Sequence, residues 1–160
     1  MKVLNIITKN LCLDGISSSV MNYYNNINKD KIKMDFVAQS VIDSIKDNIE
    51  KNGDHVYIIK GRQKNPFNYV KKLTELIKEN KYDIVHAHGS SGILCLEMIA
   101  AKKAGCKIRI AHSRNTKADH KIIDKILRPI FNRTYTDAFS CGKDAGEWLF
   151  GKRDFEIIKN

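Results

Sequence analysis

The sequence predicts an α/β domain of the Rossmann-like type, in which a mostly parallel sheet of about six or seven strands lies between two layers of helices. Short β-branched or aromatic segments alternate along the whole chain with segments whose apolar residues recur at helical spacing. Strands separated by helices in this way pair in parallel through right-handed crossovers, with helices on both faces. The length of 160 residues and the 42% content of hydrophobic residues are typical of one globular domain, 1–160.

Seven segments are predicted as strands because each is short and contains Val, Ile or aromatic residues. They are 2–8, 33–38, 55–59, 83–87, 107–111, 136–140 and 155–158. The fourth has Ile84 and Val85 at its centre and reads as a buried, central strand.

Six segments between the strands are predicted as helices. They begin near residues 16, 42, 66, 93, 117 and 143. Asp14 or Ser17 is expected to cap the first helix, and Gly53 is expected to end the second. Asn65 and Pro66 are expected to begin the third as its cap and first residue.

Targeting signals and linkers are not evident. The apolar run near the N-terminus, residues 3–7, is too short for a signal peptide or a membrane span. The four cysteines (Cys12, Cys95, Cys106 and Cys141) have no CxxC spacing and lie in apolar segments. Reduced thiols are therefore expected rather than a disulfide or a zinc site, together with a cytoplasmic location.

The net charge of +10 is concentrated in residues 101–133, which contain ten Lys or Arg and two Asp. Such a patch favours acidic partners, which include phosphates, nucleic acid and anionic membranes. The patch lacks interleaved aromatic residues, and the chain has no helix-turn-helix or RNP pattern, so nucleic acid is not predicted as a partner.

The predicted helix near 117–128 carries much of this charge. On a helical wheel Lys117, Lys121, Lys125 and Arg128 form one stripe, and an apolar arc lies opposite: Ile122, Ile123, Ile126, Leu127, Ile130 and Phe131. Pro129 is expected to kink or end the regular helix. Two interpretations remain open. The stripe docks on an anionic membrane, or the arc packs on the sheet and the lysines are its solvated face.

Two histidines end the central strand. His86 and His88 are two residues apart and should share one face, before the chain turns through Gly89 and Gly92 into the next helix. Polar side chains at the carboxyl end of a strand, followed by Gly and Ser, are typical of a ligand crevice in an open α/β sheet. The alternative is that one of the histidines is packed between sheet and helix. No nearby Cys, Asp or Glu completes a metal-ligand set, so no metal is predicted.

Four segments, in order along the chain, resemble the N-terminal half of a bacterial family 4 glycosyltransferase. They are the opening MKVLNIIT with LDGISS at 13–18, YDIVHAHG at 82–89, IAHSRNT at 110–116 and FEIIKN at 155–160. The resemblance implies a GT-B enzyme, built from two Rossmann-like domains with a cleft between them, of which this chain is the acceptor-binding half.

The resemblance also implies the reaction. The C-terminal half, with its pair of glutamates eight positions apart, is absent from this chain and would hold the nucleotide-diphosphate sugar donor. The full enzyme would be metal-independent and retaining, would build a surface polysaccharide or glycolipid on a sugar or lipid-linked acceptor, and would need no cofactor in this domain. The chain alone is expected to be inactive.

Site residues follow from the same resemblance. His112 matches the histidine that faces the transferred sugar and is the expected catalytic residue; the alternative is that it caps a strand end. The expected substrate-binding residues are Gly15, Ile16, Ser17, His88, Gly89, Arg114 and Asn115. Asp14 stands where the family has glycine and would repel phosphate, so residues 14–15 are alternatively only a turn and a helix cap. Arg114 is alternatively a solvated loop arginine.

Membrane contact follows from the family as well, because several members dock on the inner face of the cell membrane. Lys117, Lys121, Lys125 and Arg128 are the expected docking residues, which would make the protein peripheral on that membrane. A different class of function also remains open: a stand-alone α/β module that binds a sugar or phosphorylated ligand in the same crevice without catalysis.

Overall fold

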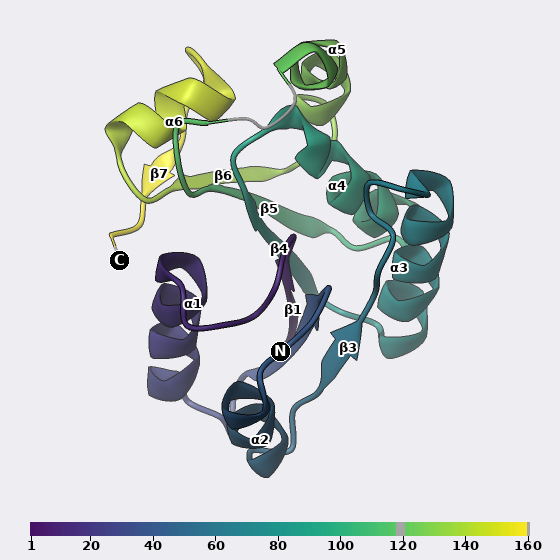
Figure 1. Cartoon of the computed structure of the whole chain (residues 1–160), viewed down its shortest axis with the longest axis vertical. Coiled ribbons are helices and arrows are strands. Elements are labelled where there is room, and N and C mark those ends of the chain that lie inside the picture. The colour runs from purple at the N-terminus through teal and green to yellow at the C-terminus, as the bar shows by residue number, and fades with distance from the viewer. Residues whose placement is uncertain (118–120, 160) are drawn as a thin grey trace.

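The computed structural model describes residues 1–117 and 121–159 and shows one seven-stranded parallel sheet (Figure 1). The strands are β1 (Lys2–Ile7), β2 (Lys33–Ala38), β3 (Val56–Ile58), β4 (Ile84–Gly89), β5 (Ile108–Ser113), β6 (Asp137–Ser140) and β7 (Glu156–Ile157). Their order across the sheet is β3-β2-β1-β4-β5-β6-β7, and every neighbouring pair is parallel. The predicted Rossmann-like fold class is confirmed. β4 and β5 each run two residues further than predicted, so that His88 and His112 belong to the strands.

Six helices and one short 3₁₀ turn connect the strands. They are α1 (Gly15–Asn26), α2 (Asp43–Lys51), α3 (Pro66–Asn80), the turn η1 (Gly92–Leu94), α4 (Cys95–Lys103), α5 (Lys121–Phe131) and α6 (Lys143–Phe150). Asp14 caps α1 by accepting from Ser17 N–H, and Asn65 caps α3 by accepting from Asn68 N–H, directly before Pro66. Both caps agree with the sequence. Cys95 and Cys106 are buried thiols, and Cys12 and Cys141 are half-buried; all four are free.

The helices form two layers, one on each face of the sheet (Figure 1). On one face, α1 and α2 pack through a cluster that includes Tyr24, Phe36 and Ile49. On the other face, α3, α4, α5 and α6 pack over the larger cluster, which includes Leu73 and Met98. Both faces of the sheet are therefore buried, as parallel strands require.

The strand order places the crevice. The chain moves outward from β1 to β3, returns to the other side of β1 at β4, and then proceeds to β7. The loops that follow β1 and β4 therefore diverge at the carboxyl ends of two neighbouring strands. This switch point is where open α/β sheets bind ligands.

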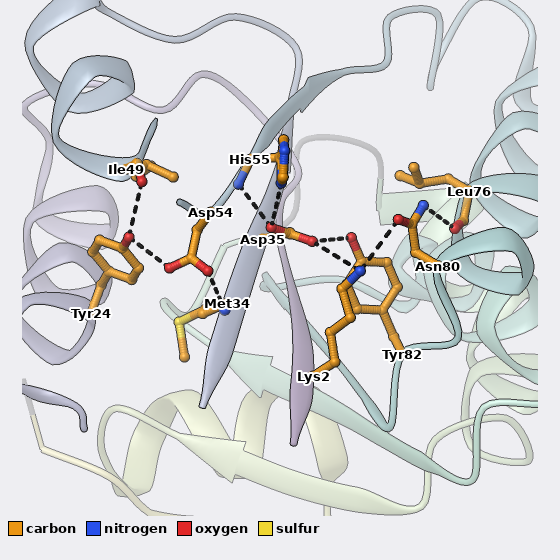
Figure 2. Close-up of polar contacts among 10 residues, drawn as sticks. All are labelled: Lys2, Tyr24, Met34, Asp35, Ile49, Asp54, His55, Leu76, Asn80 and Tyr82. Carbon is orange, nitrogen blue, oxygen red and sulfur yellow. Dashed lines mark hydrogen bonds and ion pairs between the residues drawn. The ribbon is translucent and has the colours of Figure 1, made fainter. Parts of the chain in front are cut away.

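A buried polar network lies at the amino ends of the strands, opposite the crevice (Figure 2). Asp35 of β2 accepts from the Tyr82 hydroxyl at 2.6 Å and from His55 N–H at 2.8 Å, and Lys2 Nζ lies 3.7 Å from it. Burial and the Asp35 carboxylate raise the pKa of Tyr82 well above its usual range, which keeps the phenol a proton donor. These contacts tie together the amino ends of β1, β2 and β4, away from the crevice, and we assign them to stability.

The neighbouring carboxylate, Asp54, completes this network. It accepts from the Tyr24 hydroxyl at 2.8 Å and from Met34 N–H at 3.2 Å (Figure 2). Helix α1 is thereby fixed to the start of β2.

Helix α5 differs from the prediction in its end and in the face that it buries. Pro129 lies inside the helix, which continues to Phe131, so of the two expected effects, a kink or an end, the end at Pro129 does not occur. The ring of Phe131 is fully buried and stacks on Phe150 with centroids 6.0 Å apart, which holds the last turn in place. Ile122 and Ile126 are 77% and 66% exposed, so this part of the apolar arc does not pack on the sheet.

The polar side of α5 faces inward because of two specific contacts. Asp124 is buried and accepts from Gly92 N–H at 2.6 Å and from Arg128 Nε at 2.8 Å. Arg128 Nη1 also donates to the carbonyls of Trp148 and Leu149. A Cβ atom on Gly92 would lie 3.0 Å from the Asp124 carbonyl oxygen, so this close approach needs glycine. Arg128 is therefore not part of an exposed basic stripe, which corrects its assignment as a docking residue.

The other three residues of the predicted stripe are exposed. Lys121 and Lys125 lie on α5, whereas Lys117 precedes the helix. In the described residues no helix combines the length and the apolarity that crossing a bilayer requires.

Candidate substrate site at the switch point

A polar pocket of about 240 Å³ opens at the carboxyl ends of β1 and β4. Its walls come from the segments after β1, β2 and β3, from the end of β4 with the turn that follows it, and from the loop after β5. They include Thr8, Lys9, Asp14, Ile16, Gln39, His88, Gly89, Ser90, Ser91, Asn115 and Lys117. The structure therefore brings four of the predicted substrate-binding residues, from three separate segments, to one pocket: Ile16, His88, Gly89 and Asn115.

His88 is buried at the inner wall of this pocket and is held by two hydrogen bonds. Its Nδ1 accepts from Arg114 Nε at 3.1 Å, and its Nε2 lies 2.9 Å from Asn5 Oδ1. Because a guanidinium can only donate, Nδ1 carries no proton and Nε2–H donates to Asn5. This pair of contacts fixes one neutral tautomer of the ring.

His86 and His112 form a second pair behind His88. His86 Nε2 lies 3.0 Å from His112 Nδ1, and the two rings stack nearly parallel. The Nε2 atom of His112 is buried and, within the described residues, has no hydrogen-bond partner. His112 is 1% exposed and does not line the pocket, so the expected catalytic residue lies beneath the surface of this domain.

All three rings are held neutral. Burial, and next the charge of Arg114, lower the pKa of His86 to about 3. Burial, Arg114 and His86 lower the pKa of His112 to about 2. Burial also lowers the pKa of His88 far below its usual value, with smaller effects of His86 and Arg114. At neutral pH these side chains are hydrogen-bonding groups, not cations.

The three rings also form a cluster of candidate metal ligands, the one such group of three in the described part of the chain. One nitrogen from each lies within 4.8 Å of the others. Both nitrogens of His88 are already engaged, however, and the Arg114 guanidinium would repel a cation. The arrangement therefore favours a hydrogen-bond network over a metal centre.

The N-terminus of α1 is occupied by the protein itself. The Asp14 carboxylate accepts from Ser17 N–H at 2.7 Å, and Ser17 Oγ accepts from Cys12 N–H at 3.2 Å. Ser17 is fully buried and Gly15 is exposed, and neither lines the pocket. Asp14 is therefore the helix cap that the sequence predicts, whereas Gly15 and Ser17 do not line this pocket and their contact with substrate stays a prediction.

In the loop after β5, Arg114 points into the interior, whereas Asn115 and Lys117 line the pocket. Arg114 is 8% exposed and donates to His88 and, at 3.4 Å, to Ser19 Oγ, so it is not a solvated loop arginine. Asn115 Oδ1 accepts from Lys117 N–H at 2.8 Å, a local turn that places both residues on the pocket wall.

Sequence reasoning missed several pocket residues. Thr8 and Lys9 directly follow β1. Polar residues at the carboxyl end of a strand are typical of a crevice, and this rule, which identified His86 and His88, could have been applied to β1 as well. Asn5, which contacts His88 but does not line the pocket, was also missed, although it is a lone polar residue within an apolar strand. Gln39, which donates to the Thr8 carbonyl at 2.8 Å, directly follows β2 and carries the same signal.

Comparison with known proteins agrees with this geometry. A family model described as glycosyl transferase 4-like matches residues 12–134. EpsF of Bacillus subtilis (strain 168), which is named as a glycosyltransferase, is 32% identical over 153 residues, covering 89% of this chain and 39% of that protein. The chain thus spans well under half the length of this relative.

Solved structures share the fold at low identity. HepE of Anabaena, in complex with UDP and glucose, has a TM-score of 0.72 and 15% identity, covering 100% of this chain and 44% of that one. MurG of Acinetobacter baumannii has a TM-score of 0.65 and 11% identity, covering 98% and 43%. The UDP-GlcNAc 2-epimerase of Neisseria meningitidis, bound to UDP-GlcNAc, has a TM-score of 0.63 and 14% identity, covering 99% and 45%.

Epimerases and transferases share this architecture, so the fold by itself does not separate the two activities. The family model matches more than half of the chain and therefore identifies its family. With its parallel seven-stranded sheet and its match over residues 12–134, this chain belongs to the family 4-like glycosyltransferases of GT-B fold.

Proposed function

We propose that this domain is the acceptor-binding half of a nucleotide-sugar-dependent, retaining glycosyltransferase that builds a surface polysaccharide or glycolipid in the cytoplasm. The observation that carries the proposal is the pocket at the β1/β4 switch point, built from His88, Gly89 and Asn115 with two lysines, Lys9 and Lys117. The hydroxyl and amide groups of Ser90, Ser91 and Asn115 suit sugar hydroxyls, and the lysines suit a phosphate.

We also propose that His112 is the catalytic residue, because its ring is neutral and one of its nitrogens has no partner in the described part of the chain. Its buried Nε2 has no hydrogen-bond partner within the described residues, and its link to His86 fixes the ring. A neutral, preorganised group of this kind stabilises charge that develops on a transferred sugar without reorganisation. The donor would be held by a second domain, so we expect no sugar transfer from residues 1–160 alone.

The pocket is tested by a substitution that fills it. In the longer protein that joins this domain to a donor-binding domain, Ser90→Trp should raise the KM for acceptor at least tenfold, because a large ring replaces a hydroxyl on the pocket wall. The KM for the nucleotide sugar should change less than about twofold, since the donor binds the other half. Asn25→Trp, at an exposed position of α1, is the matched control and should change neither constant. Ligand binding without transfer by any longer form would favour the binding-module alternative.

We further propose that α5 docks on an anionic membrane surface. The exposed isoleucines Ile122 and Ile126 alternate with the exposed lysines Lys121 and Lys125, an amphipathic arrangement typical of peripheral helices. Ile122→Asp with Ile126→Asp should abolish co-sedimentation with vesicles containing anionic lipid, whereas Ile58→Asp, on an edge strand, should not. Equal pelleting on neutral and anionic vesicles would contradict the electrostatic part.

A further inference from the structure

A short turn, residues 90–92, follows β4 and forms one wall of the polar pocket. Ser90 and Ser91 line the pocket, and Gly92 begins η1. Among the described residues, none from α5 or α6 lines the pocket, yet both helices bind the backbone of this turn. The shape of the wall therefore depends on two helices that lie outside the pocket.

Helix α5 binds the turn through Asp124. The carboxylate is buried, and its Oδ1 accepts from Gly92 N–H at 2.6 Å. A hydrogen bond to an ionised acceptor is roughly twice as strong as one between neutral groups. The backbone of α5 also lies directly against Gly92, because a Cβ atom there would come within 3.1 Å of the Arg128 backbone nitrogen. The end of the turn is thus fixed to α5.

Helix α6 binds the turn through Trp148. Its indole Nε1–H donates to the Ser90 carbonyl at 2.9 Å. Arg128 then joins the two helices: its Nε donates to Asp124 at 2.8 Å and its Nη1 donates to the Trp148 carbonyl at 2.7 Å. The guanidinium carbon lies 5.7 Å from the centre of the Trp148 ring, within the range of a cation–π contact. The contacts therefore form a closed circuit that starts at the Gly92 N–H and returns to the Ser90 carbonyl.

The two ends of this circuit fall on either side of Ser91. The carbonyl before it is bound by α6, and the N–H after it is bound by α5. Ser91 itself is extended, with φ −143° and ψ 159°. Because both peptide groups that flank it are held, the backbone from which its hydroxyl projects is fixed as well. Asp124 and Arg128 carry opposite charges, so the circuit fixes the wall without adding net charge beside the pocket.

We infer that Asp124 and Trp148 are positioning residues for the substrate, which hold Ser90 and Ser91 in the geometry in which the pocket binds it. A wall that is ordered before binding loses little conformational entropy when the ligand arrives, so the affinity depends on the contacts that order it. This inference rests on the proposed function and adds to its site two residues that lie outside the pocket.

Calorimetry with residues 1–160 tests the inference. The probe is glucose 1-phosphate, whose hydroxyls and phosphate match the groups proposed for the pocket. Trp148→Phe keeps an aromatic ring and removes the donor to Ser90, and Asp124→Asn keeps the shape of the side chain and removes its charge. Each should raise the Kd for glucose 1-phosphate at least fivefold. Both changes are conservative, and urea unfolding verifies that the variants are folded.

Tyr24→Phe is the matched control. It also removes one donor, the hydroxyl from which Asp54 accepts at 2.8 Å, but at the amino ends of the strands, away from the pocket. If all of these contacts served stability alone, the Kd would follow the loss of stability in every variant. Positioning predicts instead that Tyr24→Phe lowers the free energy of unfolding and changes the Kd less than twofold.

The indole of Trp148 supplies a spectroscopic measure. It is the one tryptophan in the chain of 160 residues, so its N–H gives a single indole signal in a ¹H–¹⁵N spectrum. Glucose 1-phosphate should shift this signal, because the bond from the indole ends on the wall that binds the ligand. No shift at a saturating concentration overturns the assignment of Trp148.

The remaining outcomes separate this inference from the proposed function. A Kd within twofold of that of the unaltered chain, for Trp148→Phe or Asp124→Asn, overturns the assignment of the residue concerned. An equal rise in Kd for Tyr24→Phe makes the contacts structural and overturns the whole inference, whereas the pocket still stands or falls on Ser90→Trp in the longer protein. Absence of glucose 1-phosphate binding by the unaltered chain counts against the proposed pocket itself and, with it, against the inference.

Discussion

Replacing Glu97 with Ala is expected to destabilise the domain by about 3–5 kcal/mol, because it leaves a buried guanidinium without its counter-ion. Glu97 is fully buried, and the Arg62 side chain is 9% exposed. Burial alone lowers the pKa of Arg62, but the charge and hydrogen bonds of Glu97 outweigh it and hold that pKa above its ordinary value. Because arginine stays protonated in proteins even without a counter-ion, Arg62 remains charged after the substitution and its desolvation is no longer offset. Urea unfolding of residues 1–160 measures the change.

A surface ion pair and a double substitution serve as controls. Lys46 and Glu50 form an exposed i,i+4 pair at 3.8 Å, so Glu50→Ala should cost less than about 0.5 kcal/mol. Arg62→Met combined with Glu97→Leu should recover most of the loss, since no buried charge remains. A loss below about 1 kcal/mol for Glu97→Ala would show that water reaches this pair.

Acid is expected to destabilise the domain from about pH 6.5 downward, well above the range in which carboxylates titrate. The pKa values of His86 and His112 are lowered to about 3 and about 2, and that of His88 is lowered strongly. Between those values and the ordinary histidine pKa of about 6.5, the unfolded chain binds protons that the folded chain does not. Stability is therefore complete above about pH 6.5 and is lost as pH falls, at up to about 1.4 kcal/mol per pH unit for each ring.

The free energy of unfolding between pH 7 and pH 5 measures this effect. His86→Gln should reduce the slope by about one proton, because burial keeps this ring unprotonated in the folded chain. A slope near zero over this range would mean that the three rings are hydrated and not held neutral by burial.

The strands, caps and fold class could be predicted because each depends on local sequence. β2 and α6 have the predicted bounds, and Asp14 and Asn65 cap helices as expected. The family resemblance also held, and two of the four segments that carry it lie at the ends of β4 and β5. In all these cases a few adjacent residues determine the outcome.

What could not be predicted depends on contacts between distant segments. The wheel of α5 favoured its isoleucines as the buried face, but Asp124 bonded to Gly92, together with Arg128 bonded to the end of α6, turns the polar side inward. Likewise the tautomer of His88 is set by Arg114 and by Asn5, which lie 26 and 83 residues away along the chain. None of these partners can be identified before the strand order is known.

The proposed acceptor site is tested most directly by one ratio, the acceptor KM of Ser90→Trp divided by that of the unaltered longer protein, compared with the same ratio for the donor. Ser90 lies on the wall of the pocket between β1 and β4 and is not placed in the catalytic machinery. We predict an acceptor ratio of at least about 10 with a donor ratio near 1. An acceptor ratio near 1, with a folded protein that still transfers sugar, would contradict the assignment of this pocket to the acceptor.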